Sequence, residues 1–138
     1  MSDFDHSHIS VGEIRLHVVQ AKPVNFNDDT KLVVFLHGFP EYWESWHSQL
    51  EAMREAGYWA VAPDMRGYGD SDKPYEVAEY EVEKLAGDIA GLIKALGRKK
   101  AIVVGHDWGA VVAWMFAQEH PDLLERLAIL NVPHPLRM

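Results

Sequence analysis

Cysteine is absent from the 138-residue chain. The protein therefore has no disulfide framework, no thiolate ligand for a metal ion and no cysteine nucleophile. An excess of positive charge is missing as well, since 13 Lys and Arg residues stand against 21 Asp and Glu, for a net charge of −8. A chain of this charge repels phosphate backbones, so we expect no nucleic-acid partner.

Long apolar runs are also missing. The longest wholly apolar run, Ala110 to Ala117, is too short to cross a bilayer, so we expect no membrane partner. The segment from Met1 to His8 is polar and has no basic cluster followed by an apolar stretch, which predicts no signal peptide and a cytoplasmic protein. The apolar share of 48% and the charged share of 25% are typical of one globular domain.

Short β-rich runs alternate along the chain with segments of helical periodicity. A tight hairpin is predicted around Gly12, and continuous apolar runs indicate strands that are buried on both faces. The predicted strands are 9–11, 14–19, 31–37, 59–63, 101–104 and 127–130, and the predicted helices are 46–53 (with Gly57 as its stop), 79–96 and 108–119. This order predicts an α/β fold with a mostly parallel sheet. The helix 108–119 is apolar on most of its faces, so we expect it to be deeply covered. Functional residues are then expected in the loops after Leu36, Pro63 and Gly105, at the carboxyl ends of strands.

The segment Gly105-His106-Asp107-Trp108-Gly109 follows a predicted strand and opens a predicted helix, which is the context of a nucleophile elbow. The flanking glycines allow the strand and the helix to approach closely. A carboxylate at the centre of this turn can attack a carbon atom without a general base and form an ester. The alternative is that Asp107 serves only as the N-cap of the helix.

The segment His37-Gly38-Phe39-Pro40 follows the first buried strand. It is similar to the oxyanion loop of α/β hydrolases, in which backbone N–H groups hold a developing negative oxygen. The donors would be the N–H groups of Phe39 and Trp108. A simple turn rich in Gly and Pro is the alternative for this segment alone.

Together these segments resemble the N-terminal half of an α/β-hydrolase-fold epoxide hydrolase. The matching stretches are HGFPEYWESWHSQL (37–50), PDMRGYGDSDKP (63–74), VVGHDWGA (103–110) and LNVPHP (130–135). The resemblance implies a small-molecule epoxide as substrate and Asp107 as the nucleophile. It also implies an oxyanion hole from Phe39 and Trp108, with Trp108 lining the pocket. His37 and Pro40 would shape the loop, with a cis bond before Pro40, and His106 would be structural.

Haloalkane and haloacid dehalogenases share the fold and the Asp nucleophile. They often have Asn where this chain has Phe39, and the fluoroacetate type resembles Gly-His-Asp-Arg-Gly at the elbow, where this chain has Trp108. These two positions favour epoxide opening over dehalogenation, although the indole N–H of Trp108 could serve a halide. Neither a cofactor nor a metal is expected, because Arg66-Gly67-Tyr68-Gly69 lacks the third glycine of a dinucleotide motif and no Asp and His cluster has ligand spacing. This segment is expected to be structural, with Arg66 and Asp72 fixing a loop near the site.

Epoxide hydrolases also use two lid tyrosines and a late His with an acidic partner. The lid would begin after Asn131 to Pro135, and none of the eight histidines occupies the late position. Residues 1–138 are therefore expected to form one truncated hydrolase core without cap or C-terminal part, with about six strands and helices on both faces. We expect little or no turnover and self-association, as a homodimer, through an open sheet edge near 127–130. A non-catalytic, self-associating half-domain is the alternative.

Overall fold

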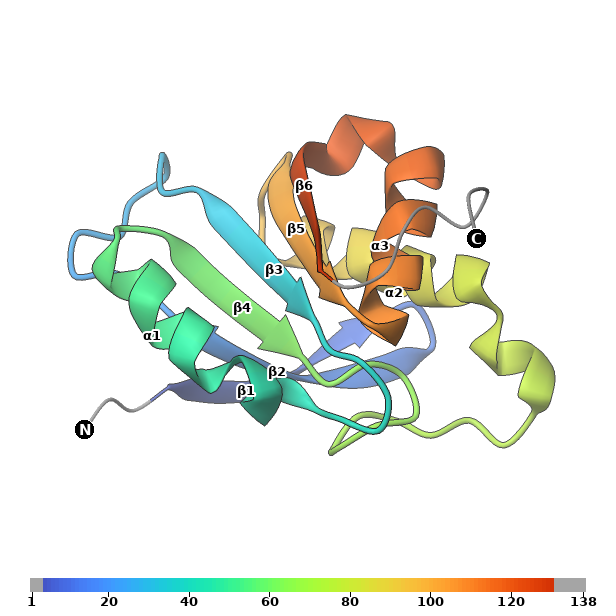
Figure 1. The fold of residues 1–138 in the computed structure, drawn as a ribbon. Coiled ribbons are helices and arrows are strands. Elements are labelled where there is room, and N and C mark those ends of the chain that lie inside the picture. Colours follow the sequence, from blue (N-terminus) through green and yellow to red (C-terminus); the bar gives the residue numbers. More distant parts are fainter. Residues whose placement is uncertain (1–3, 131–138) are drawn as a thin grey trace.

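Six strands form one sheet in the computed structural model, which describes residues 4–130 (Figure 1). The strand order is β1-β2-β4-β3-β5-β6. Strands β3, β4, β5 and β6 run parallel to one another, whereas β2 is antiparallel to both β1 and β4. The strands are β1 (Asp5–Val11), β2 (Ile14–Ala21), β3 (Leu32–Leu36), β4 (Trp59–Pro63), β5 (Ala101–His106) and β6 (Leu124–Leu130). The expected mostly parallel α/β sheet is confirmed.

Apolar side chains explain why the central strands lie inside the molecule. Every residue of β3 and β4 is buried, as continuous runs of apolar residues predict for strands covered on both faces. The hairpin of β1 and β2 turns at Gly12, whose φ of 63° is readily adopted only by glycine. Both hairpin strands are longer than predicted, because their polar outer residues still take part in the ladder from Asp5 to Gln20.

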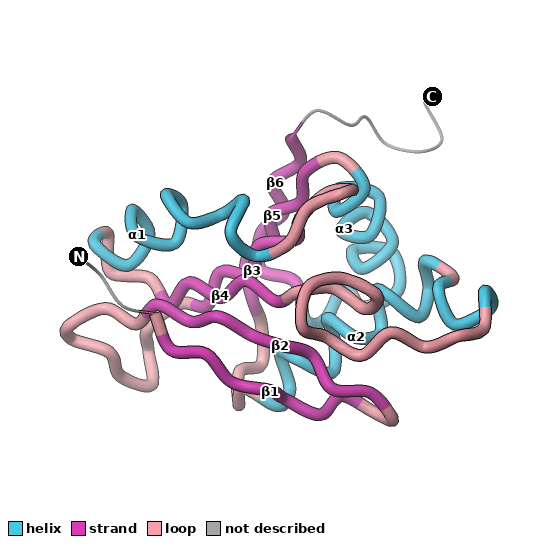
Figure 2. The backbone as a smooth tube through the Cα atoms, turned by 90° about the horizontal axis from the view of Figure 1, so that it is seen from below, coloured by secondary structure: helices cyan, strands magenta, loops and turns pink. Residues whose placement is uncertain are grey.

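Helices cover both faces of the sheet, as expected (Figures 1 and 2). The short 3₁₀ helix η1 (Trp43–Trp46) and α1 (His47–Glu55) pack on one face, where Trp46 and Leu50 contact the β3 side chains Val33 and Phe35. The opposite face is covered by α2 and α3, which share one core with alternate residues of β3. Their bounds are α2 (Val82–Ala95) and α3 (Trp108–Glu119), and two further 3₁₀ turns are η2 (Val77–Tyr80) and η3 (Pro121–Leu123).

Two predictions about the helices are wrong in detail. The predicted helix 79–96 begins only at Val82, because Glu81 is extended, with φ −60° and ψ 142°, and separates η2 from α2. The third helix is not covered on most of its faces. Its buried residues, which include Val112 and Phe116, lie on one side, while Trp114 and Met115 are only partly buried. The apolar sequence of a helix thus shows how much of its surface can be buried. The segments that pack against the helix decide how much of that surface is buried.

The sheet ends at β6, which pairs with β5 and with no other strand in the range 4–130. Its free edge is the open edge predicted near 127–130. Among the described residues, no helix has the length and apolar character needed to traverse a bilayer. The stretch Asn131 to Pro135, which the resemblance places at the start of a lid, lies outside the described residues.

Candidate active site

Asp107 occupies the sharp bend between β5 and α3. Its φ is 57° and its ψ is −123°, and it is the one non-glycine residue with a positive φ in the described chain. Side chains rarely adopt this region, and such strain is concentrated at functional sites. The Asp107 side chain makes no capping hydrogen bond to the following helix. The geometry therefore differs from that of an ordinary N-cap.

Glycines on both sides of Asp107 make the bend possible. A Cβ atom on Gly109 would lie 2.2 Å from the Leu36 carbonyl oxygen, so α3 approaches the end of β3 at a distance that only glycine allows. A Cβ atom on Gly105 would lie 2.5 Å from the Gly109 carbonyl oxygen. The spacing of these glycines in the sequence thus corresponds to a real close contact between strands and helix.

Backbone N–H groups surround the Asp107 carboxylate. Phe39 N–H donates a hydrogen bond to Asp107 Oδ2 at 3.2 Å. The pKa of Asp107 is lowered from its usual value, first by the N–H of Trp108 and then by that of Phe39, with a smaller contribution from the charge of His106. The carboxylate is therefore ionised at neutral pH. The two donors that the sequence singled out converge on this one side chain.

The His37-Gly38-Phe39-Pro40 segment is anchored by His37, which is buried. His37 Nε2 accepts a hydrogen bond from Met65 N–H at 2.9 Å, so the ring proton is on Nδ1, which donates to the Gly38 carbonyl at 2.9 Å. Burial lowers the pKa of His37 and keeps the imidazole neutral. The bond between Phe39 and Pro40 is cis, as predicted. His37 thus ties the loop after β3 to the loop after β4.

Gly38 lies against Asp107, and Glu41 closes the far side of the loop. A Cβ atom on Gly38 would lie 2.7 Å from the Asp107 Cβ and 3.1 Å from Glu41 Oε1. Glu41 Oε1 accepts the Gly38 N–H at 3.0 Å and lies 3.7 Å from His106 Nδ1. Glu41 was not predicted from the sequence, although its position four residues after His37 in the same loop could have indicated it.

Aromatic rings form the open side of the site. Phe39 is 66% exposed and Trp108 is 41% exposed. Tyr68 lies beneath them, with its ring centroid 5.0 Å from that of His37 and 6.2 Å from that of Phe39. The charge of Asp107 contributes, after burial, to a raised pKa of Tyr68. The sequence predicts a structural loop near the site here, and the structure places Tyr68 of that loop close to the acid.

The loop that Arg66 and Asp72 were expected to fix is held by two separate interactions. Arg66 binds Asp88 of α2, whereas Asp72 accepts the Arg15 N–H of β2 at 2.8 Å. The two residues thus fix opposite ends of the segment after β4. This segment carries Met65 and Tyr68 to the site.

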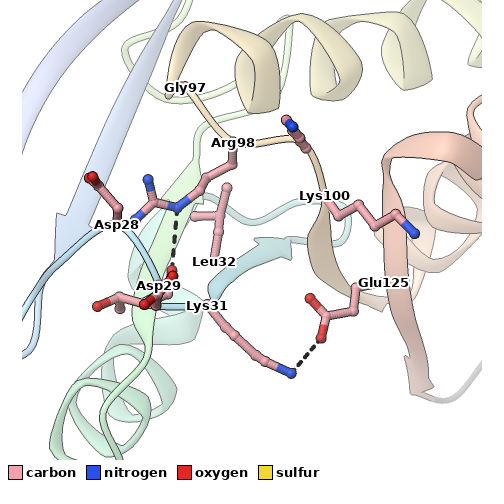
Figure 3. A pocket seen from close by; sticks show the side chains of 10 residues that line it. Asp28, Asp29, Lys31, Leu32, Gly97, Arg98, Lys100 and Glu125 are labelled. Carbon is pink, nitrogen blue, oxygen red and sulfur yellow. Dashed lines mark hydrogen bonds and ion pairs between the residues drawn. The ribbon is translucent and has the colours of Figure 1, made fainter.

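Another cavity lies at the other end of the sheet (Figure 3). It has a volume of about 620 Å³ and lies where β3, β5 and β6 begin, whereas Asp107 follows the end of β5. Lys31 Nζ and Glu125 Oε2 form an ion pair across it at 2.7 Å. This cavity is therefore remote from Asp107. Residues 4–130 contain no group of three or more His, Cys, Asp or Glu arranged to hold a metal ion.

The site and the fold together define a class of protein. A mostly parallel sheet with helices on both faces, and an acid in a glycine-flanked bend between strand and helix, is the core of an α/β hydrolase. A family described as "alpha/beta hydrolase fold" matches residues 31–137. The chain belongs to this α/β-hydrolase family.

Its relatives include several epoxide hydrolases. Epoxide hydrolase 1 of Caenorhabditis elegans is 44% identical over 135 residues, which are 98% of this chain and 32% of that protein. The AB hydrolase superfamily protein YfhM of Bacillus subtilis is 46% identical over 92% of this chain and 43% of its own length. The crystal structure of Epoxide Hydrolase A from Mycobacterium thermoresistibile matches with a TM-score of 0.89 and 39% identity, over 95% of this chain and 40% of the other.

The chain thus spans less than half the length of each of these relatives. The predicted resemblance to the N-terminal half of an epoxide hydrolase is confirmed at the level of sequence and fold.

Proposed function

We propose that this chain carries the nucleophile of an epoxide hydrolase and that the nucleophile is Asp107. The observation that supports this most strongly is the ionised carboxylate in a strained bend, facing the N–H groups of Phe39 and Trp108. A carboxylate held this way is exposed to a small electrophile, because the bend directs it away from the strand and the helix. The relatives named as epoxide hydrolases indicate which electrophile that is.

In the proposed reaction, a carboxylate oxygen of Asp107 attacks one carbon of the three-membered ring. The new C–O ester bond forms as the ring C–O bond breaks, and the electron pair goes to the former epoxide oxygen. That oxygen takes a proton from water and becomes the hydroxyl of a hydroxyalkyl ester. The N–H groups of Phe39 and Trp108 would then stabilise the oxyanion that forms when hydroxide or water attacks the ester carbonyl.

The ester is expected to persist on this chain. Two histidines lie near Asp107 in the described part of the molecule, and each is engaged elsewhere. Both ring nitrogens of His37 are hydrogen-bonded, and His106 Nδ1 faces Glu41. Neither is arranged to activate a water molecule against the ester.

The test is the intact mass of the protein after incubation with styrene oxide. We expect a mass increase of one epoxide, located on Asp107 by peptide sequencing, with little release of diol. Asp107→Asn should remain unmodified, and Asn is suitable because it tolerates a positive φ. Asp122→Asn, an exposed acid in η3, is the matched control and should react like the wild type. An unmodified wild type would refute the proposal.

The same experiment separates epoxide opening from dehalogenation. If a bromoalkane esterified Asp107 with release of bromide while epoxides did not react, the chain would be a dehalogenase-type protein instead. If neither reagent modified Asp107, the alternative of a non-catalytic half-domain would be supported.

We also propose that the chain self-associates through the free edge of β6. Unpaired backbone N–H and C=O groups along an edge strand pair readily with another strand. Ala128 and Leu130 are exposed there, and the last three residues of β6 carry no charge that would repel a second strand.

A further inference from the structure

Three histidine rings meet on one face of the hairpin formed by β1 and β2. His8 lies directly opposite His17 in the ladder, and His6 precedes His8 by two residues, so the three side chains share one face. The centroid of the His17 ring lies 5.2 Å from that of His6 and 5.4 Å from that of His8. Because β1 is the outermost strand (Figure 2), this cluster joins an edge strand to the rest of the sheet.

His17 is the buried centre of the cluster and is bound to Asp64. Its Nδ1 lies 2.7 Å from Asp64 Oδ2. The Asp64 carboxylate also accepts the N–H groups of Trp43 at 2.8 Å and of Asp70 at 3.1 Å. Since its oxygens act as acceptors, the Nδ1 of His17 is the donor of the bond between them. In neutral His17 the other nitrogen, Nε2, is therefore an acceptor.

His6 occupies this acceptor. Its Nδ1 lies 3.0 Å from His17 Nε2, and its ring faces the uncharged ring of Trp43 in η1, with the centroids 5.3 Å apart. In the neutral pair, His6 Nδ1–H donates to His17 Nε2. One added proton is tolerated, because His17 can then donate to His6 instead. A second added proton leaves two N–H groups and two positive charges facing each other, so the contact is lost.

The loop after β4 faces the cluster with Asp64 and Asp70. Asp64 is a single carboxylate and balances one imidazolium, whereas the side chain of Asp70 belongs to an exposed residue and is screened by solvent. His8 Nε2 lies 3.2 Å from the Asp70 carbonyl oxygen, to which it donates whether its ring is neutral or charged. Protonation of His8 therefore keeps this bond and adds a positive charge beside His17.

Helix α1 reaches this end of β1 through Phe4. The Phe4 ring centroid lies 4.9 Å from that of His47 and 5.1 Å from the Arg54 guanidinium carbon. Both of these groups are basic, and His47 is paired with Glu51 at 3.1 Å. Through these contacts α1 adds no net negative charge that would balance a second proton on His6 and His17.

We propose that His6 and His17 form a pH-sensitive switch, which holds the start of β1 on the sheet at neutral pH and releases it in mild acid. The pair in contact binds one added proton and the released pair binds two, so a falling pH favours release. An imidazole side chain in water titrates near about pH 6.5, and the change from pH 7.5 to pH 5 is therefore sufficient. Release separates residues 5–8 from residues 17–20 of β2.

Hydrogen exchange measured by mass spectrometry tests the switch in the wild-type chain. After correction for the intrinsic exchange rates, we expect the amides of residues 5–8 to lose at least tenfold protection between pH 7.5 and pH 5, relative to the amides of β3. The comparison with β3 removes any change in global stability, because buried central strands exchange through global unfolding. An unchanged relative protection would overturn the inference.

His6→Gln replaces the titrating ring of an exposed residue by a neutral amide. The protection of residues 5–8 should then differ less than twofold between the two pH values, whether or not the amide replaces the hydrogen bond. His120→Gln, which removes a histidine after α3 and outside the cluster, is the matched control and should keep the wild-type change. A wild-type change in His6→Gln would assign the pH dependence to another group and refute the switch.

A second measurement needs no variant. Nitrogen-15 NMR of the histidine rings reports the protons on His6 and His17 directly. We expect the second proton to bind to the pair at the same pH at which residues 5–8 lose protection. Two fully protonated rings in a chain whose residues 5–8 are still protected would contradict the switch.

Discussion

The glycine residues around Asp107 show how the absence of a Cβ atom allows the close backbone contacts on which the candidate site depends. Gly109 and Gly105 face backbone atoms, which cannot move aside as the end of a flexible side chain can. Gly87, in the middle of α2, has nothing within 4 Å of the position of a Cβ atom. The three glycines therefore have different physical roles although the sequence shows the same residue.

Gly109→Ala and Gly87→Ala are expected to have opposite effects on stability. The Cβ atom at position 109 would overlap the Leu36 carbonyl, so we expect the free energy of unfolding to fall by about 1–3 kcal/mol or more. At position 87, alanine is the better helix former, and stability should rise by about 0.5–1 kcal/mol. Urea unfolding of both variants measures the difference. Equal effects would contradict the close approach of α3 to β3.

His37 is expected to make the protein less stable in mild acid. Its pKa in the folded state is lowered from 6.5 by burial, so between that lowered pKa and 6.5 the unfolded chain binds more protons. The contribution of His37 to the free energy of unfolding is fully present above pH 6.5 and is lost as the pH falls below 6.5. The free energy of unfolding then falls by at most about 1.4 kcal/mol per pH unit.

Urea unfolding between pH 5 and pH 7.5 tests this expectation. His37→Gln, which has no titrating ring, should lose this slope relative to the wild type. The partly exposed His47, paired with Glu51 at 3.1 Å, supplies the control His47→Gln, which should retain it. An unchanged slope in His37→Gln would show that another group causes the acid sensitivity.

Between elements, a buried ion pair joins the loop after β4 to α2. Arg66 and Asp88 are buried, and their bidentate contact places two N–H donors on two carboxylate oxygens. Burial raises the pKa of Asp88, whereas the contact with Asp88 raises the pKa of Arg66. The short bidentate geometry favours the ionised carboxylate at neutral pH. This pair holds the segment that carries Met65 and Tyr68 to the candidate active site.

A double-mutant cycle measures this link. Arg66→Met leaves the buried Asp88 carboxylate without its partner and should lower the free energy of unfolding by about 3–5 kcal/mol. Asp88→Leu should cost less, because Arg66 keeps its ion pair with Glu79 at 3.0 Å. The double variant should lose clearly less than the sum, because no unpaired charge remains. Additive losses would indicate that the two side chains are independent. Chemical denaturation of the four proteins supplies the values.

The boundaries of elements were predicted less well than their existence. Apolar periodicity identified α2, but the extended backbone of Glu81 that delays its start has no signature in the hydrophobic pattern. The same pattern identified α3 but overstated its burial. Burial depends on which other segments are available to pack on each side of a helix, and local periodicity carries no information about this.

For the whole molecule, the proposed self-association through the free edge of β6 can be tested by a single charge. Ala128→Lys places a charge on that edge and should shift the protein toward monomer, since lysine is a residue that protects natural edge strands. Light scattering over a range of micromolar concentrations measures the mass. Ala78→Lys, at an exposed position in η2, adds the same charge elsewhere and should leave association unchanged. A wild type that is monomeric throughout would refute self-association.

The sequence by itself determined the α/β sheet, the bend at Asp107 and the loop at His37, because these depend on local patterns of apolar residues and on glycines at fixed spacing. Only the tertiary structure decided which residues that are far apart in the sequence come into contact. Phe39 and Asp107 are 68 residues apart, Arg66 and Asp88 are 22 apart, and His17 reaches Asp64 across 47 residues. Such contacts arise from the order of the strands in the sheet, and so only the folded structure could place Tyr68 beside the acid.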